Sequence, residues 1–267
     1  MTLHDKYKKL LEYIKSLESV VIAFSGGVDS TFLLQAAKEA LGDQAMALTI
    51  KAPFHLQWEI EETKELTTQL GISHVIIEHK EIPDEIQYNP SDRCYLCKKK
   101  VFQGILDFAK ENNFLYVADG TNFDDTKDYR PGMKALKELN VVSPLLEVGF
   151  TKDEIRQMSK ILSLPTWDKP AYACILTRIQ YGQKIIEEDL RKVEKAEKYL
   201  IDLGFPVARV RLHDQLARIE VAPDRLKDLL EEKQMKKISV DFKAMGFQYV
   251  TVDLEGYRTG SQNEVLS

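Results

Sequence analysis

One stretch near the N-terminus constrains the fold more than any other part of the chain. Residues 20–24 form a short run of β-branched and aromatic side chains, and residues 25–30 read Ser-Gly-Gly-Val-Asp-Ser. Apolar residues then recur at helical spacing over residues 31–41. The sequence therefore predicts a strand, a glycine turn and a helix in direct succession, as in α/β proteins.

The glycine turn has the composition of a phosphate site. Gly26 and Gly27 allow positive φ angles and a close approach of the backbone to a ligand. The first turn of the helix adds free amides and the positive end of its dipole, and Ser25 and Ser30 offer hydroxyl groups. Asp29 would repel a phosphate unless a divalent cation lay between them, and magnesium is the usual bridge. The alternative is a tight turn that only starts a helix.

The loop resembles the PP-loop of the ATP pyrophosphatases and lacks the Gly-Lys-Ser/Thr ending of the nucleoside triphosphatase loop. The resemblance implies that a substrate oxygen attacks the α-phosphate of ATP. The products would be AMP, pyrophosphate and an activated substrate. We expect the following residues to bind ATP: Ala23, Phe24, Ser25, Gly26, Gly27, Asp29, Ser30 and Gly120.

Strands and helices alternate through the first part of the chain, with strands expected at 45–50, 73–78 and 115–118 and helices at 58–70 and 98–112. This alternation predicts βαβ units and a doubly wound, Rossmann-like parallel sheet whose ligands lie at the carboxyl ends of the strands. We expect a PP-loop ATP pyrophosphatase domain over residues 1–168.

A smaller α+β domain that binds the substrate is expected over residues 169–267. It should contain a helix at 185–203 and a hairpin that turns at Asp214 and Gln215. A helix from 223 to 232 and a last strand at 249–254 complete the prediction, with the strands forming a short antiparallel sheet.

Composition narrows the class of protein. The chain has 267 residues, of which 44% are hydrophobic and 30% charged, as in ordinary globular proteins. No run approaches the roughly 20 apolar residues of a membrane span, and the N-terminus lacks the apolar core of a secretory signal. We therefore expect a cytoplasmic protein without a membrane partner. The net charge of −5 argues against nucleic acid as a general partner. We also expect a homo-oligomer.

Charged residues mark two further regions. Four carboxylates follow the strand at 115–118, namely Asp119, Asp124, Asp125 and Asp128, as an acidic turn or as part of the ATP site. In the second domain, Glu197 lies within the apolar stripe of a helix and should hold a cation or an arginine, or else reach solvent. Arg209 and Arg211 share one strand face and could clamp a phosphate or lie on a solvated surface. Arg258 lies in a turn-rich tail, where it could serve a site.

The three cysteines suggest metal or catalytic chemistry, because an odd number does not fit a disulfide framework. Cys94 and Cys97 form a C-x-x-C element where a loop enters a helix, and Cys174 follows the expected domain boundary. A redox pair, half a zinc site and a set of cluster ligands are all compatible with C-x-x-C. Three thiolates would suit an iron–sulfur cluster with one iron left open.

Together these features resemble the LarE family of sulfur transferases, PP-loop enzymes that make the nickel-pincer nucleotide cofactor. The resemblance covers essentially the whole chain. It rests on the PP-loop and on the motifs at residues 128–132, 173–178 with 181–182, 203–206 with 209–211, and 246–254. The implied substrate is a pyridinium biscarboxylate mononucleotide, whose carboxylate would be adenylated by ATP with Mg²⁺ and then converted to a thiocarboxylate by sulfur from a donor.

The resemblance also implies roles for individual residues. Some family members sacrifice the sulfur of one cysteine at the position of Cys174, whereas others bind a four-iron four-sulfur (4Fe-4S) cluster on three cysteines. With Cys94, Cys97 and Cys174, this chain resembles the second kind. Arg209 and Arg211 would hold the substrate phosphate, with Arg178 and Arg258 at the substrate site and Glu197 close by. We expect Cys174, Asp29, Arg178 and Glu197 to be catalytic. The rival predictions are a tRNA thiolase, a sacrificial Cys174 and a non-catalytic adenine-nucleotide sensor. An amidating synthetase is a further rival, although 267 residues leave no length for a glutaminase domain.

Overall fold

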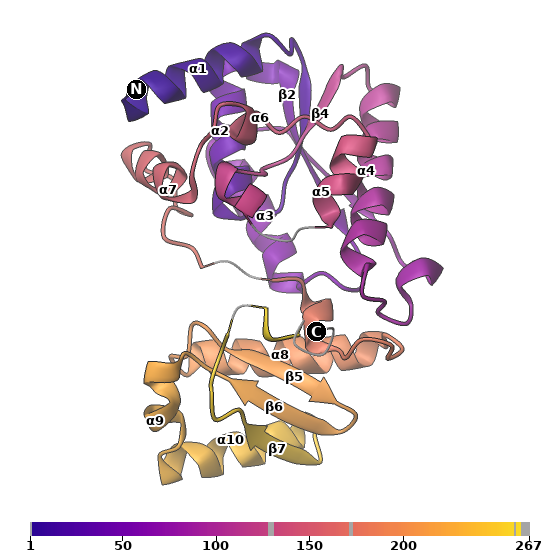
Figure 1. The fold of residues 1–267 in the computed structure, drawn as a ribbon, viewed down its shortest axis with the longest axis vertical. Coiled ribbons are helices and arrows are strands. Elements are labelled where there is room, and N and C mark those ends of the chain that lie inside the picture. Colours follow the sequence, from indigo (N-terminus) through magenta and orange to yellow (C-terminus); the bar gives the residue numbers. More distant parts are fainter. Residues whose placement is uncertain (1, 128–130, 171–172, 259, 263–267) are drawn as a thin grey trace. The chain divides into compact units, whose positions relative to one another are not determined.

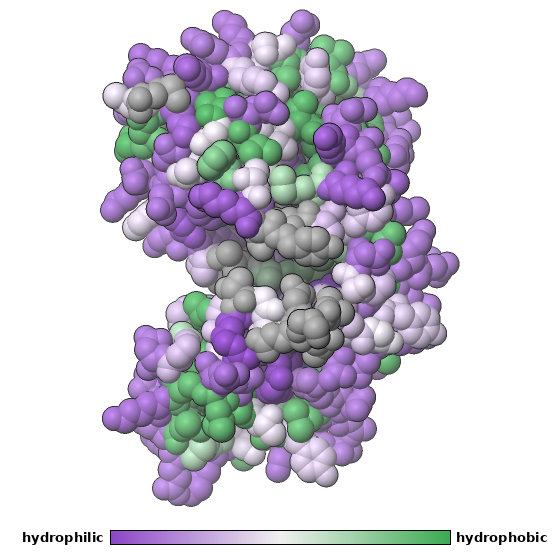
Figure 2. Space-filling model, in the orientation of Figure 1, coloured by the Kyte–Doolittle hydropathy of each residue, from purple (hydrophilic) through white to green (hydrophobic). Residues whose placement is uncertain are grey.

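A computed structural model describes residues 2–127, 131–170, 173–258 and 260–262. The chain divides into two compact units, one of residues 1–86 and 92–172 and the other of residues 87–91 and 173–267. Within the described residues, no helix is both long enough and apolar enough to cross a membrane. The face drawn in Figure 2 is largely hydrophilic, and its apolar side chains lie in separate small patches.

The first unit is built around four parallel strands in the order β3-β2-β1-β4. The strands are β1 (Val20–Ala23), β2 (Ala45–Lys51), β3 (His74–Glu78) and β4 (Tyr116–Ala118). The helices are α1 (Leu3–Lys15), α2 (Val28–Leu41), α3 (Gln57–Leu70), α4 (Arg93–Glu111), α5 (Gly132–Glu138), α6 (Pro144–Glu147) and α7 (Lys152–Ile161). Shorter 3₁₀ turns span Gly42–Gln44, Asp84–Ile86 and Phe123–Lys127.

Helices cover both faces of this sheet. Alternate residues of β1 point in opposite directions, so that Val20 and Ile22 join one buried cluster and Val21 joins the other. The first cluster packs α1, α2 and α7 on one face, and the second packs α4 and α5 on the other (Figure 1). The predicted doubly wound parallel sheet is therefore confirmed.

The second unit contains a three-stranded sheet in the order β5-β6-β7, with β5 (Arg209–His213), β6 (Leu216–Glu220) and β7 (Tyr249–Val252). Its helices are α8 (Glu187–Asp202), α9 (Leu226–Leu229) and α10 (Glu232–Ala244), with 3₁₀ turns η4 (Ile175–Arg178) and η5 (Pro223–Arg225). The hairpin at Asp214 and Gln215 is confirmed, because His213 pairs with Leu216 across a two-residue turn in which Asp214 has a φ of 53°.

The expectation of an antiparallel sheet is wrong for the last strand. β7 runs parallel to β6, since α9 and α10 cross between the two strands and bring the chain back in the same direction. The predicted helix at 223–232 is a 3₁₀ turn followed by the single-turn α9. The sequence analysis missed α10, whose buried Ile238 and Phe242 are one helical turn apart.

Residues 87–91 join the second unit although they interrupt the first in sequence. Asn89 is fully buried, and its side-chain amide donates to the carbonyl oxygens of Leu176, Ile179 and Gln180 at 3.3, 2.8 and 3.0 Å. The amide of Ile185 also donates to the carbonyl of Gln87 at 2.8 Å. The sequence analysis did not predict that residues 87–91 belong to the second unit, because Asn89 lies in a stretch without periodicity.

Candidate active site

The glycine loop lies at the carboxyl end of β1, as its sequence predicts. The Phe24 amide donates to the carbonyl of Leu48 at 2.8 Å, and the Thr49 hydroxyl donates to the Phe24 carbonyl at 2.7 Å, so the end of the strand is fixed. Gly27 is the N-cap of α2 and no side chain caps this helix. The first-turn amides of α2 are thus available to an anion, at the end of the helix that favours negative charge.

Two glycines of this region leave little room for a larger residue. Gly26 has a φ of +69°, and an added Cβ would lie 3.2 Å from Thr63 Cγ2. A Cβ on Gly120 would lie 3.1 Å from the Ser30 amide nitrogen and 3.3 Å from Asp29 Cβ. Gly120 therefore lets the loop after β4 approach the first turn of α2.

Asp29 is surrounded by polar groups from two distant segments. Lys152 Nζ lies 2.5 Å from Asp29 Oδ2, and Asn122 Nδ2 donates to Asp29 Oδ1 at 3.4 Å. Burial raises the pKa of Asp29, although Lys152 acts in the opposite direction. A magnesium ion usually binds one or two carboxylates together with substrate phosphates, so Asp29 beside the α2 amides fits such an ion.

Two lysines at this loop were missed by the sequence analysis. Besides Lys152, the ammonium of Lys169 donates to the carbonyl of Gly26 at 3.0 Å and to Glu62 at 2.6 Å. Neither lysine belongs to a motif, and the tertiary fold alone brings them to the loop. Each ammonium group is paired with a carboxylate, and both lie beside the loop whose free amides are suited to phosphate.

The acidic stretch after β4 organises the loops around Asp29. Asp119 accepts from the Ser143 hydroxyl at 2.6 Å and from Thr121. Asp124 accepts from the backbone amide of Lys152 at 2.8 Å, and Asp125 accepts from the backbone amide of Asn122 at 3.0 Å. These carboxylates position the two side chains that contact Asp29. Asp128 and the rest of the motif at 128–130 lie outside the described residues, as do residues 171–172 of the motif around Cys174.

The cysteines belong to different units. Cys94 and Cys97 lie in the first five residues of α4, which begins at Arg93 and not at Lys98, so the loop-to-helix junction comes earlier than expected. Their i, i+3 spacing puts both thiols on one side of the helix. Cys94 and Cys174 are exposed and Cys97 is half-buried. Thiolates at this spacing fit two ligands of an iron–sulfur cluster. Among the described residues, no three His, Cys, Asp or Glu side chains gather into a metal site.

In the second unit, Arg178 and Glu197 form a buried ion pair. Arg178 Nε and Nη2 donate to the two carboxylate oxygens at 2.7 and 2.9 Å, and the Arg178 side chain has no exposed surface. Glu197 also accepts from the Val210 amide at 2.8 Å. Burial alone would lower the pKa of Arg178, yet the Glu197 carboxylate raises it above its usual value. The expectation that Glu197 holds a cation or an arginine is thus met by Arg178.

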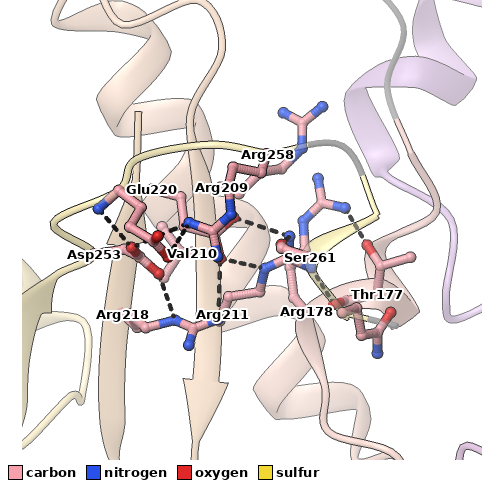
Figure 3. A network of polar contacts seen from close by, with 12 residues as sticks. Thr177, Arg178, Arg209, Val210, Arg211, Arg218, Glu220, Asp253, Arg258 and Ser261 are labelled. Atoms are coloured by element: carbon pink, nitrogen blue, oxygen red, sulfur yellow. Dashed lines mark hydrogen bonds and ion pairs between the residues drawn. The ribbon is translucent and has the colours of Figure 1, made fainter. Parts of the chain in front are cut away.

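Arg211 is held by a second buried carboxylate. Its Nε and Nη2 donate to Glu220 at 2.9 Å each, and its Nη1 donates to the Thr177 carbonyl at 2.6 Å. Arg218 reaches the same Glu220 at 3.1 Å. Figure 3 shows the side chains of Arg211 and Arg218 beside Glu220. The sequence analysis did not name Glu220, because its role depends on the pairing of β5 with β6.

Arg209 and Arg258 take different positions in this network. The Arg209 guanidinium lies 5.1 Å from the centre of the Tyr257 ring, and its Nη1 donates to the Ala208 carbonyl at 2.8 Å. Burial lowers the pKa of Arg209, and the nearby Arg178 acts in the same direction. Arg258 contacts Glu255 at 2.7 Å and Asp253 at 3.7 Å.

Several arginines of this network line a cavity of about 350 Å³ within the second unit. Four of the lining residues are arginines, and the other lining groups include hydroxyl, amide and imidazole side chains. Its polar and charged lining residues include Arg178, Arg211, Arg218, Arg258, His213, Gln180, Ser261 and Gln262. Such a cavity is suited to an anionic ligand of nucleotide size. Arg209 packs on the Tyr257 ring and is not among the described residues that line the cavity.

Comparison with known proteins finds relatives along the whole chain. The family model described as NAD synthase matches residues 2–113. The chain is 40% identical over 266 residues to an uncharacterized protein of Synechocystis, with 99% of each chain covered. It is 35% identical over 269 residues to the pyridinium-3,5-bisthiocarboxylic acid mononucleotide synthase of Lactiplantibacillus plantarum, covering 100% of this chain and 96% of that protein. An uncharacterized protein of Methanocaldococcus jannaschii is 32% identical over 258 residues, which is 94% of this chain and 98% of that one.

Proposed function

Because this chain belongs to the LarE-like family of PP-loop ATP pyrophosphatases, we propose that it uses ATP to insert sulfur into a pyridinium biscarboxylate mononucleotide. The observation that carries the proposal is the full-length similarity to the L. plantarum synthase, together with the glycine loop at the end of β1. In this proposal the first unit binds ATP and the second unit binds the mononucleotide.

The first step is adenylation of a carboxylate. A carboxylate oxygen of the substrate attacks the α-phosphorus of ATP, the bond between that phosphorus and the bridging oxygen breaks, and pyrophosphate leaves. The amides at the start of α2 and the hydroxyls of Ser25 and Ser30 bind the pyrophosphate end. Asp29 would hold a magnesium ion, which neutralises phosphate charge when bound.

The second step replaces AMP by sulfur. A sulfur nucleophile attacks the activated carboxyl carbon, the bond from that carbon to the AMP oxygen breaks, and a thiocarboxylate remains. Cys94, Cys97 and Cys174 would hold a four-iron four-sulfur cluster, which supplies the sulfur when bound. The C-x-x-C pair supports this source over sacrifice of Cys174, which would leave Cys94 and Cys97 without a role.

The arginine-lined cavity would bind the substrate phosphate in this scheme. Arg211 is already oriented by Glu220, so a phosphate that enters the cavity meets a guanidinium whose conformation is fixed. Arg258 lies in the same wall. We propose that Arg209 acts next to them and that Arg178, which Glu197 holds in place, completes the cationic environment.

Product analysis tests the proposed function. The full chain, reconstituted with iron and sulfide without air, is incubated with ATP, magnesium and the biscarboxylate mononucleotide, and the products are separated and weighed by mass spectrometry. We expect AMP, pyrophosphate and a product in which sulfur replaces a carboxylate oxygen. ADP in place of AMP would contradict the assignment. A chain that becomes lighter by one hydrogen sulfide would identify Cys174 as the sulfur source instead of the cluster.

A further inference from the structure

Lys152 is held at the glycine loop by several contacts. It is the first residue of α7, and its backbone amide donates to Asp124 at 2.8 Å. Thr151, immediately before it, forms a capping box with Glu154, which fixes the start of the helix. α7 packs against α2, so the ammonium reaches Asp29 in the first turn of α2. The backbone of Lys152 is thereby fixed, while its side chain is still 31% exposed.

Local structure does not explain a lysine at this position. The N-terminus of a helix carries partial positive charge, and a cation in the first turn is unfavourable there. The next two residues, Asp153 and Glu154, are acidic, as the helix dipole favours. Lys152 therefore owes its place to something outside α7, and the described contact of its ammonium group is with Asp29.

The same carboxylate suits a magnesium ion bound to ATP, so the ammonium and the metal would compete for Asp29. The amides at the start of α2 lie next to Asp29 in sequence and would hold the phosphates. We propose that Lys152 of α7 binds a phosphate group of ATP at the glycine loop. When a metal ion takes Asp29, the Lys152 ammonium turns from the carboxylate to an oxygen of the bound triphosphate.

Lys169 differs from Lys152 in its surroundings. It donates to both the Gly26 carbonyl and Glu62, and its side chain is only 14% exposed. These contacts make Lys169 a positioning residue that fixes the loop backbone. Lys160, on the same helix as Lys152, lies 4.5 Å from the centre of the Trp167 ring and serves as the matched control.

Equilibrium binding to the full chain tests this inference, with titration calorimetry for MgATP and for adenosine. For Lys152→Met we expect MgATP to bind about ten- to a hundredfold more weakly, which is the loss of one charge-assisted hydrogen bond, while adenosine binds as before. Lys152→Arg should restore part of the affinity. Lys160→Met should leave both ligands unaffected. An unchanged MgATP affinity, or equal weakening of MgATP and adenosine, would overturn the inference.

A second measurement uses the unmodified chain and does not depend on the stability of a variant. Lysines are acetylated with a mild amine-reactive acetylating reagent, and the modified positions are quantified by mass spectrometry. MgATP should protect Lys152 and leave Lys160 reactive, whereas adenosine should protect neither. Full reactivity of Lys152 under saturating MgATP would contradict the proposal. The inference rests on the ATP site of the proposed function but not on its sulfur chemistry. If the unmodified chain binds no MgATP, the proposed function itself is refuted. If it binds MgATP and the Lys152 variant binds it equally well, only the inference is refuted.

Discussion

Replacement of Glu197 by alanine should destabilise the second unit strongly. The change leaves the guanidinium of Arg178 fully buried, without the two carboxylate oxygens that now lie at 2.7 and 2.9 Å. It also removes the acceptor of the Val210 amide in β5. Breaking a buried ion pair from one side costs about 3–5 kcal/mol, and the orphaned amide adds to this loss. The unfolding equilibrium of this unit should shift by roughly a hundredfold to several thousandfold.

The stability of the second unit is measured by hydrogen exchange with mass spectrometry, on peptides from α8 and β5, over a series of denaturant concentrations. Glu188 provides the control, because it is an exposed residue of the same helix. Glu188→Ala should change the free energy of unfolding by less than about 0.5 kcal/mol. Glu197→Gln keeps the shape and one acceptor, so its effect should fall between the two. A loss for Glu197→Ala as small as that of the control would refute the reasoning that Arg178 needs this partner.

Three further results are expected. Gly120→Ala should weaken ATP binding about tenfold, since its Cβ would lie 3.1 Å from the backbone of α2. Gly104→Ala is the control and should leave ATP binding unchanged, because its Cβ makes only a 3.7 Å contact. Equal effects of the two variants would contradict the steric argument. Burial lowers the pKa of His74 to about 4, so between about pH 6.5 and pH 4 the unfolded chain binds a proton that the folded chain does not. The free energy of unfolding should therefore fall as the pH drops through this range. Urea titrations should show a shallower fall for His74→Gln. Cys94→Ser or Cys97→Ser should abolish the roughly four irons bound per chain after anaerobic reconstitution, and iron analysis that shows full loading would contradict a role for the C-x-x-C pair.

The fold around the glycine loop could be predicted because its determinants are local. The β-branched run before Ser25, the two glycines and the helical periodicity after them lie within about 20 residues. The position of Gly120 follows from the rule that parallel strands end at one edge of the sheet. The orientation of β7 was not predictable in this way, because it depends on how α10 crosses from one strand to the next.

The site was less predictable where a side chain acts through a distant partner. Lys152 and Asp29 are separated by 123 positions, and no motif connects them. Arg211 was assigned correctly to one face of its strand with Arg209, yet its carboxylate partner Glu220 comes from the neighbouring strand. Periodicity indicates which side a residue faces, whereas the partner depends on strand register and on helix packing. Buried charges need partners, so Glu197 was expected to have one, but the sequence did not identify Arg178.

The placement of residues 87–91 in the second unit affects how that unit can be produced separately. A gene fragment that begins at residue 173 would lack Asn89, and the carbonyls of Leu176, Ile179 and Gln180 would lose the amide that joins them. Those carbonyls lie beside Arg178, in the segment that forms a wall of the arginine-lined cavity. An excised second unit therefore requires the peptide around Asn89 to be supplied, either as a separate segment or fused through a new linker. Ribosomal synthesis supplies it early, since Asn89 emerges long before the residues that it will tie together.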